Sequence, residues 1–258
     1  MTNLLSAKIY DLGQPYYVGM PHYPVHPPYL YTLNKLHGEF VLPNGASSAS
    51  ETFTLGGHVG THIDALAHFS CDGKLHGGVA PTQSYGSGVD QYSIDNVAPI
   101  FRPGVLFDVA ALQGVDALPE DFVVTPEHLE ACGVKPPAGG VALIRTGWAR
   151  FWSDAKRYIT GGHGAIVVGP GPTEPAARWL SERGIFAAGS DTVAFERVPS
   201  KMEVHVHLLV EKGIHIIECL NLEALARDAV KQFTFVALPL KIRGGTGSPI
   251  RPVALVPE

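Results

Sequence analysis

Short apolar runs alternate with capped helical segments along most of this chain, and this alternation constrains the fold more than any other feature. Four runs have the length and composition typical of buried strands: 105–110, 141–145, 185–188 and 214–218. Thr125 can cap a helix that begins at Pro126 and ends before Gly133. A second helix is expected between Thr173 and Gly184. Strands that alternate with helices in this way predict a single α/β domain.

The remaining segments extend this pattern towards both ends of the chain. Further strands are expected at 6–12, 51–55 and 232–242, and further helices at 205–212 and 222–230. Residues 13–31 hold five prolines among aromatic side chains. Because proline fixes φ and removes a backbone donor, an extended loop is expected there. No repeat or long linker divides the sequence, so residues 1–258 are expected to form one domain.

Charge and composition argue against several classes of function. The formal net charge is −5 and the Lys and Arg residues form no basic run, which argues against nucleic acid or an anionic membrane as a partner. No segment approaches the ~20 apolar residues of a membrane-spanning helix, and the amino terminus lacks the pattern of a signal peptide. Three scattered cysteines are too few for a disulfide framework. A reducing, cytoplasmic setting is therefore expected.

Metal-competent side chains are concentrated in one run, His58-Val-Gly-Thr-His62-Ile-Asp64-Ala-Leu-Ala-His68-Phe69. Three histidines and one aspartate lie within eleven residues. Neutral imidazole and carboxylate are natural ligands of Zn²⁺ and Mn²⁺. This run is therefore the strongest candidate for a functional site.

The spacing within the run favours a catalytic metal on an extended segment. His58 and His62 have the four-residue spacing of helical zinc proteases, but β-branched neighbours and a glycine disfavour a helix, and no glutamate separates the histidines. On an extended backbone His62 and Asp64 face the same side, and His58 can join them if the chain bends at Gly60. His68 is then either a fourth ligand or an unligated imidazole suited to proton transfer.

A second candidate cluster lies far downstream in the sequence. It comprises His205, His207, His215 and Glu218. His205 and Glu218 bracket a helix–turn–strand unit, so both could reach one site. The alternative is a surface helix that carries His207 and Glu211.

The run from Gly57 to Phe69 closely resembles the signature of the metal-dependent cyclase-like hydrolases, a superfamily that includes bacterial kynurenine formamidases and isatin hydrolases. The resemblance covers most of the chain. It includes Gly19-Met-Pro, His26-Pro-Pro-Tyr29, Arg145-Thr-Gly-Trp148, Gly189-Ser-Asp191-Thr192, His205-Val-His-Leu-Leu, Gly213-Ile-His-Ile-Ile-Glu218 and Gly244-Gly-Thr-Gly-Ser-Pro-Ile-Arg-Pro. The resemblance implies a mixed β-sheet core flanked by helices, in a swivelling β/β/α fold.

The resemblance also implies site roles. The positions that would bind a first metal ion are His58, His62 and Asp64. His68 would be the catalytic acid–base residue. In two-metal members Asp64 would bridge to a second ion, held by the counterparts of His205 and Glu218, whereas isatin-type members resemble a one-manganese arrangement.

Two positions depart from the family pattern. Formamidases usually carry proline where this chain has Leu66, and many members carry asparagine where it has Cys219. The Ala65-Leu66 pair and the His-Pro-Pro-aromatic segment favour the isatin-hydrolase side.

The expected function is metal-dependent hydrolysis of an amide, with Mn²⁺ or Zn²⁺ as cofactor. A cyclic amide such as isatin is the expected substrate, and hydrolysis of N-formylkynurenine by an arylformamidase is the alternative. A metal- or ligand-binding protein without turnover is a third hypothesis, although binding alone would not require His68. Tyr29, Tyr31 and Trp148 are candidates to stack on a small aromatic amide. The resemblance further implies a homo-oligomer, a dimer or tetramer, in which the loop at 13–31 reaches a partner subunit.

Overall fold

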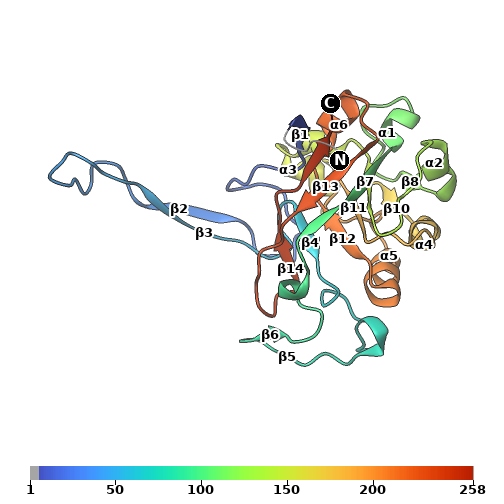
Figure 1. Ribbon diagram of the computed structural model, residues 1–258, viewed down its shortest axis with the longest axis horizontal. Coiled ribbons are helices and arrows are strands. Elements are labelled where there is room, and N and C mark those ends of the chain that lie inside the picture. Colours follow the sequence, from blue (N-terminus) through green and yellow to red (C-terminus); the bar gives the residue numbers. More distant parts are fainter. Residues whose placement is uncertain (1–5, 258) are drawn as a thin grey trace.

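A nine-stranded mixed sheet runs through the body of the molecule in the computed structural model, which describes residues 6–257 (Figure 1). In spatial order its strands are β1 (Lys8–Asp11), β15 (Val253–Val256), β13 (Gln232–Ala237), β7 (Ile100–Asp108), β9 (Val141–Arg145), β11 (Ala187–Ser190), β12 (His215–Glu218), β4 (His62–Asp64) and β14 (Gly247–Pro249). Strands β7, β9, β11 and β12 are parallel to one another, and the strands on either side of them pair antiparallel. The expected α/β class with a mixed sheet is confirmed.

Short helices flank the sheet and connect its strands. They are α1 (Val109–Leu112), α2 (Pro126–Ala131), α3 (Ala155–Thr160), α4 (Glu174–Ser181), α5 (Glu203–His205), which continues as a π-helical stretch at Val206–Lys212, and α6 (Glu223–Arg227). Single 3₁₀ turns lie at His76–Gly78, Ile94–Asn96 and Trp148–Phe151. None of the helices that the structure describes is long and apolar enough to span a membrane.

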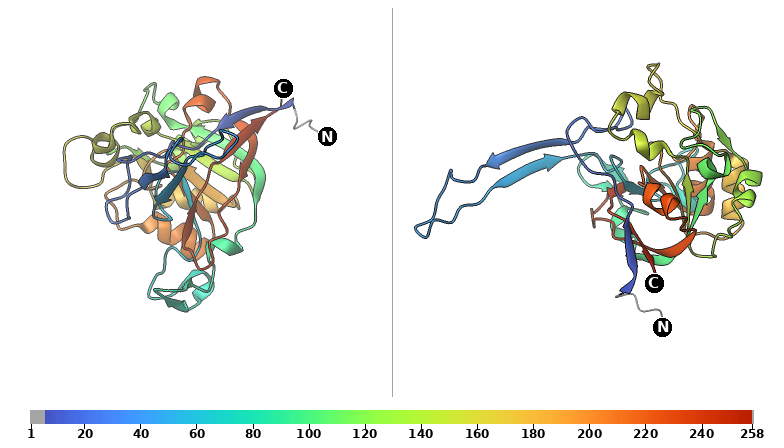
Figure 2. Two further views of the ribbon diagram at one scale, coloured as in Figure 1. Left: turned by 90° about the vertical axis from the view of Figure 1, so that its left-hand side faces the viewer. Right: turned by 90° about the horizontal axis from the view of Figure 1, so that it is seen from above.

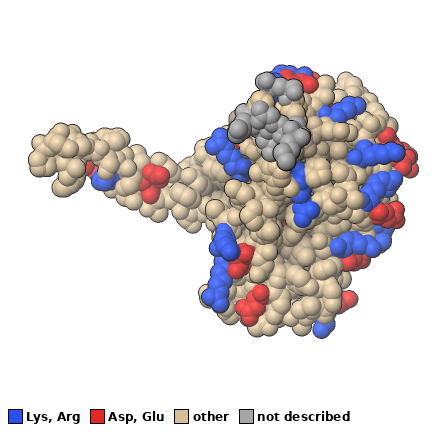
Figure 3. Space-filling model, viewed as in Figure 1, with Lys and Arg blue, Asp and Glu red and all other residues tan. Residues whose placement is uncertain are grey.

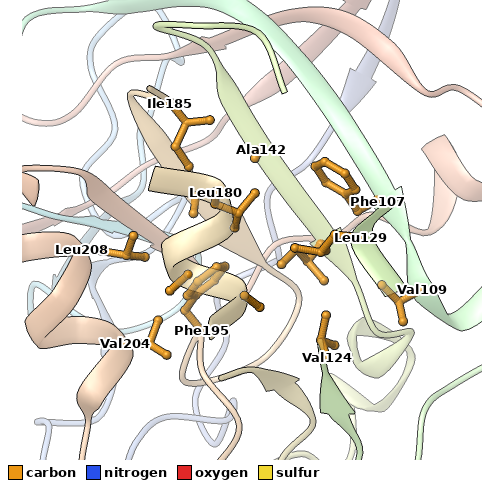
Figure 4. Close-up of a cluster of buried hydrophobic side chains, with 14 of the residues drawn as sticks. Phe107, Val109, Val124, Leu129, Ala142, Leu180, Ile185, Phe195, Val204 and Leu208 are labelled. Atoms are coloured by element: carbon orange, nitrogen blue, oxygen red, sulfur yellow. The ribbon is translucent and has the colours of Figure 1, made fainter. Parts of the chain in front are cut away.

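The central strands are buried on both faces. Successive residues of β9 enter opposite hydrophobic clusters, since Ile144 packs in one and Leu143 in the other. The first cluster fills the space between the sheet and helices α2, α4 and α5, where Leu129 and Leu180 meet Phe107 (Figure 4). Burial on both sides explains why these strands are continuous apolar runs rather than alternating ones.

Most predicted elements are confirmed, and the bounds of two strands, β7 and β13, differ most from the prediction. Strand β7 begins at Ile100, before the expected start. The strand can include Pro103 because Pro103 lies before the residues that pair with β9, so this pairing does not need the N–H that proline lacks. It ends at Asp108, whose side chain accepts from the backbone N–H of Ala111 and starts α1. Strand β13 ends at Ala237 rather than near residue 242, and Pro239 follows soon after.

A two-stranded hairpin extends away from the body as a long arm (Figures 1 and 2). It consists of β2 (Leu30–Lys35) and β3 (Ser50–Thr54), which pair antiparallel. The loop predicted at 13–31 therefore ends at Tyr29, because the next two residues already belong to β2. Smaller two-stranded pairs are β5 (Gln83–Ser84) with β6 (Gly88–Val89), and β8 (Val123–Val124) with β10 (Gly171–Pro172).

Candidate metal centre

Strand β4 carries two of the metal-competent side chains into the sheet. It lies between β12 and β14, in a register that places His62 opposite Glu218. The Nε2 atom of His62 lies 3.5 Å from Oδ1 of Asp64 and 3.4 Å from Oε2 of Glu218. Because residues two apart on a strand share a face, β4 and β12 together bring three donor side chains to one point.

A bend at Gly60 brings a third residue of the run into the cluster. Gly60 has a φ of +71°, which glycine adopts without strain, and a Cβ there would overlap the ring of Tyr16. His58 precedes the bend, and its Nδ1 lies 2.6 Å from Oδ1 of Asp64. The bend expected at Gly60 is therefore present, and it joins His58 to the residues of β4.

Helix α5 supplies a third imidazole from far along the chain. The Nε2 atom of His205 lies 3.3 Å from Oε1 of Glu218 and 3.9 Å from Oδ2 of Asp64. Its Nδ1–H donates to Oε2 of the buried Glu196 at 2.7 Å. This second bond fixes the ring so that Nε2 faces the carboxylates, as in histidines that bind metals.

The residues present fit a divalent cation. Two donor sets, His58–His62–Asp64 and Asp64–His205–Glu218, each have ligand atoms within 4.8 Å of one another. Oδ2 of Asp64 is fully buried and has no hydrogen-bond partner among the described residues. A buried carboxylate oxygen without a partner is costly unless a cation or water satisfies it. His62 donates Nδ1–H to the carbonyl of Gly60, which leaves its Nε2 free as a ligand atom.

The buried carboxylates set the protonation of the facing imidazoles. Burial lowers the pKa of His62, but hydrogen bonds to Asp64 and Glu218 outweigh this and raise the pKa to about 10. Burial also lowers the pKa of His205, but hydrogen bonds to Glu196 and Glu218 outweigh this effect and raise the pKa to about 10. Both rings therefore hold a proton at neutral pH when no cation is bound.

Metal affinity is therefore expected to depend steeply on pH. A cation that binds Nε2 of His62 or His205 must displace a proton, so acid weakens binding. The apparent affinity should fall about tenfold per pH unit for each displaced proton as the pH is lowered below the raised pKa values. Titration calorimetry in buffers of different ionisation enthalpy counts the protons released. Zn²⁺ binding without proton release would contradict the raised pKa values of both rings.

His68 lies just beyond β4 and stacks on His58. The two ring centroids are 3.7 Å apart and the planes differ by 22°. Burial lowers the pKa of His68 to about 4, with nearby His58 and His205 acting in the same direction. His68 is therefore neutral near pH 7 and can accept a proton.

A further imidazole, which the sequence reasoning did not place in the site, comes from the proline-rich loop. The ring of His26 stacks on His58 with a centroid distance of 5.3 Å and lies 6.4 Å from the ring of His68. Its segment, His26-Pro-Pro-Tyr29, was part of the family resemblance, but no role in the site was predicted for its ring. Glu196 was also missed, since nothing in its spacing to His205 indicates a hydrogen bond.

The Cyclase family model matches residues 10–197, which include the histidine-rich run and extend to Glu196. This chain belongs to the Cyclase family.

Relatives of known name agree with this membership. An isatin hydrolase of Roseibium aggregatum is 28% identical over 228 residues, covering 83% of this chain and 78% of the relative. A kynurenine formamidase of Bacillus mycoides is 27% identical over 252 residues, covering 96% of this chain and 97% of the relative. A crystal structure described as a novel cyclase superposes with a TM-score of 0.88 at 28% identity, covering 98% of this chain and 88% of that one. The named relatives are hydrolases with different substrates.

The other histidines of the downstream cluster face elsewhere. His207 pairs with Glu211 at 2.7 Å, the alternative that its spacing allowed, although its ring is buried. His215 donates Nδ1–H to the backbone carbonyl of Asp64 at 2.8 Å, and so supports β4 rather than joining either donor set. Of the four downstream residues, only His205 and Glu218 belong to the cluster.

The two departures from the family pattern have different structural settings. Cys219 follows Glu218 directly and has a φ of +56°. Asparagine tolerates this left-handed conformation better than most residues, so the asparagine that the resemblance implies at this position would suit the backbone here. Leu66 lines a separate hollow of about 250 Å³ with Arg102 and His215. Its side chain therefore gives no direct support for a choice of substrate at the metal centre.

The three aromatic residues predicted to bind substrate lie in different places. Tyr29 lines a hollow of about 620 Å³ at the base of the arm. The ring of Tyr31, which is exposed on β2, stacks beside the ring of Tyr29. Trp148 is only 3% exposed and donates its indole N–H to the carbonyl of Leu118. Trp148 also lines a hollow of about 540 Å³ with Phe151 and Arg157, and the substrate contact expected of it stays a prediction.

Replacing Gly247 by alanine is expected to weaken metal binding. A Cβ at Gly247 would overlap the imidazole of His58, so the ring must move away from Asp64. Disturbing a group that orients a ligand typically costs about 10–100-fold in metal affinity. Equilibrium dialysis of the variant measures this loss. Gly86→Ala, where a Cβ meets nothing, should bind metal as the parent does. Equal affinities in both variants would contradict the placement of His58.

Proposed function

We propose that this chain is a metal-dependent amidohydrolase that opens the C–N bond of a cyclic amide such as isatin. The observation that carries the proposal is the buried Asp64, whose unpartnered Oδ2 lies between two sets of nitrogen and oxygen donors. A partly buried imidazole, His68, lies beside these donors and is neutral near pH 7. A cation site next to a free base suits amide hydrolysis, because the cation can activate water and polarise the carbonyl while the base moves the proton.

The donor sets assign the cation-binding residues. His58, His62 and Asp64 would hold one divalent ion, and Asp64 would share a second with His205 and Glu218. Nitrogen and oxygen donors suit either Mn²⁺ or Zn²⁺. When bound, the cation would polarise the substrate carbonyl and lower the pKa of a water molecule towards ~7.

His68 moves the proton in this proposal. Its neutral ring takes a proton from the attacking water as the oxygen bonds to the carbonyl carbon. The same ring then gives the proton to the nitrogen as the C–N bond breaks. The ring-opened product is a carboxylic acid with a free amine. The acid loses its remaining proton to solvent as the carboxylate leaves, and His68 is back in its neutral state.

An arylformamidase acting on N-formylkynurenine is the second candidate. It is favoured by the kynurenine formamidase relative, which aligns along almost its whole length, whereas the isatin hydrolase relative aligns over 78% of its own. The chemistry at His68 would be the same, with an open-chain amide in place of the ring. A metal-binding protein without turnover is the third hypothesis.

Assays of isatin and N-formylkynurenine on one preparation, with metal content measured by mass spectrometry, separate these functions. Faster hydrolysis of isatin, lost with a chelator and restored by Mn²⁺ or Zn²⁺, is the expected result. Preference for N-formylkynurenine would establish the formamidase. A metal-loaded protein inactive on both substrates and on a wider panel of amides and lactones would establish the binding protein.

We further propose that the chain forms a homo-oligomer in a cytoplasmic setting, where its three unpaired cysteines stay reduced. The loop at 13–31, which leads into the arm, would reach a partner subunit.

The arm exposes large apolar side chains, among them Leu33, Phe40 and Phe53, and shows few charges (Figure 3). An isolated two-stranded hairpin is marginal in water unless something packs on it. Light scattering should give a dimer or tetramer that Phe40→Ser weakens; a monomeric parent would refute this.

A further inference from the structure

His26 differs from most histidines around the metal centre in its hydrogen bonding. Among the residues that the structure describes, neither ring nitrogen of His26 has a hydrogen-bond partner, and His68 shares this property. By contrast, a ring nitrogen of His62 donates to the carbonyl of Gly60, and one of His205 donates to Glu196. Polar groups of partly buried side chains are normally satisfied by protein, water or ligand. The two unbonded imidazoles are therefore the ones available to a ligand.

The two unbonded rings both lie against the ring of His58. The centroid of His68 is 3.7 Å from that of His58, and the centroid of His26 is 5.3 Å from it. In both pairs the ring planes are within 26° of parallel. The ring centroids of His26 and His68 are 6.4 Å apart. An oxygen of a substrate whose scissile bond is presented to His68 therefore comes within reach of His26.

The backbone holds His26 in place. Its N–H donates to the carbonyl of Tyr23 at 2.9 Å, which closes a turn. Pro27 and Pro28 follow, and proline restricts both its own φ and the residue before it. The ring of Tyr23 lies 6.0 Å from that of His26. Because His26 is already held in place, a substrate that binds it loses little free energy to ordering of the loop, which favours a role of His26 in recognition.

We infer that His26 is a substrate-contacting residue that donates a ring N–H to an oxygen of the substrate beside the scissile C–N bond. The inference rests on the proposed function. It assigns to the proline-rich loop a direct role in selecting amides that carry a second oxygen next to the bond cleaved. Isatin has such an oxygen in its ketone.

Steady-state kinetics of three variants test this contact. His26→Phe keeps an aromatic ring and removes the donor, and is expected to lower kcat/KM for isatin about tenfold, the usual cost of one neutral hydrogen bond. His26→Gln restores a donor and should recover most of the loss. His37→Phe is the control, because it makes the same substitution at an exposed histidine outside the metal centre. The control should match the parent.

Two further measurements separate the contact from a structural effect. Metal content should be unchanged in His26→Phe, and calorimetry should show about tenfold weaker binding of isatinate, the ring-opened product. Parent-like kcat/KM and isatinate affinity in His26→Phe would overturn the inference, as would loss of metal or failure of His26→Gln to recover. A parent enzyme inactive on both amides would instead overturn the proposed function, and this inference with it.

Discussion

Replacing His68 by alanine is expected to lower kcat by roughly 10²–10⁴-fold, the usual contribution of a proton-transfer residue. The metal should remain, because His68 belongs to neither donor set and contributes only its ring stacking on His58. Stopped-flow or steady-state assays give the rate, and mass spectrometry gives the metal content of the same sample. Loss of turnover with metal retained is the result that distinguishes a base from a ligand.

The pH profile of the parent provides an independent check on His68. The base form of His68 is the active one, so kcat/KM should fall as acid protonates the ring. Burial, aided by His58, lowers the pKa of His68 to about 4, so this fall belongs near pH 4 rather than near the usual value of histidine. With metal kept saturating at every pH, His68→Ala should lack that acid limb, whereas a variant of the exposed His37 should keep it. Parent-like turnover in His68→Ala would remove His68 from the mechanism.

The part of the site that spacing predicts is the part close together in the sequence. His62 and Asp64 needed only the two-residue repeat of a strand, and His58 needed only the bend at Gly60. Glu218 is placed by the antiparallel pairing of β12 with β4, and His205 by the packing of α5, and no local pattern encodes either contact. The helix–turn–strand spacing made both residues candidates, and the family resemblance implied their role as ligands.

The features that were missed leave no periodic pattern in the sequence. Strand β2 is exposed along nearly its whole length, so it lacks the alternation of apolar and polar residues that marks a half-buried strand. The stacking of His26 on His58 joins a loop to the turn before β4, and long-range packing of this kind leaves no sequence period.

Asp64 is the residue on which both donor sets depend, so its replacement should have an effect at least as large as that of His68. Asp64→Asn keeps the size of the side chain and removes its charge. It also places an amide where His58 or His205 now meets a carboxylate oxygen. Loss of a catalytic cation removes several kcal/mol of transition-state stabilisation, so turnover should fall by about 10³-fold or more.

Metal stoichiometry gives the sharper test of this bridging position. If Asp64 serves both sets, Asp64→Asn loses affinity for every equivalent of metal that the parent binds, whereas Glu218→Gln weakens only the set that contains His205. Asp90→Asn is the matched control, since Asp90 is exposed and lies outside both sets. Circular dichroism must show that Asp64→Asn remains folded. A folded Asp64→Asn protein that binds as much metal as the parent, with the same affinity, would show that the unpartnered Oδ2 is satisfied by something other than a cation.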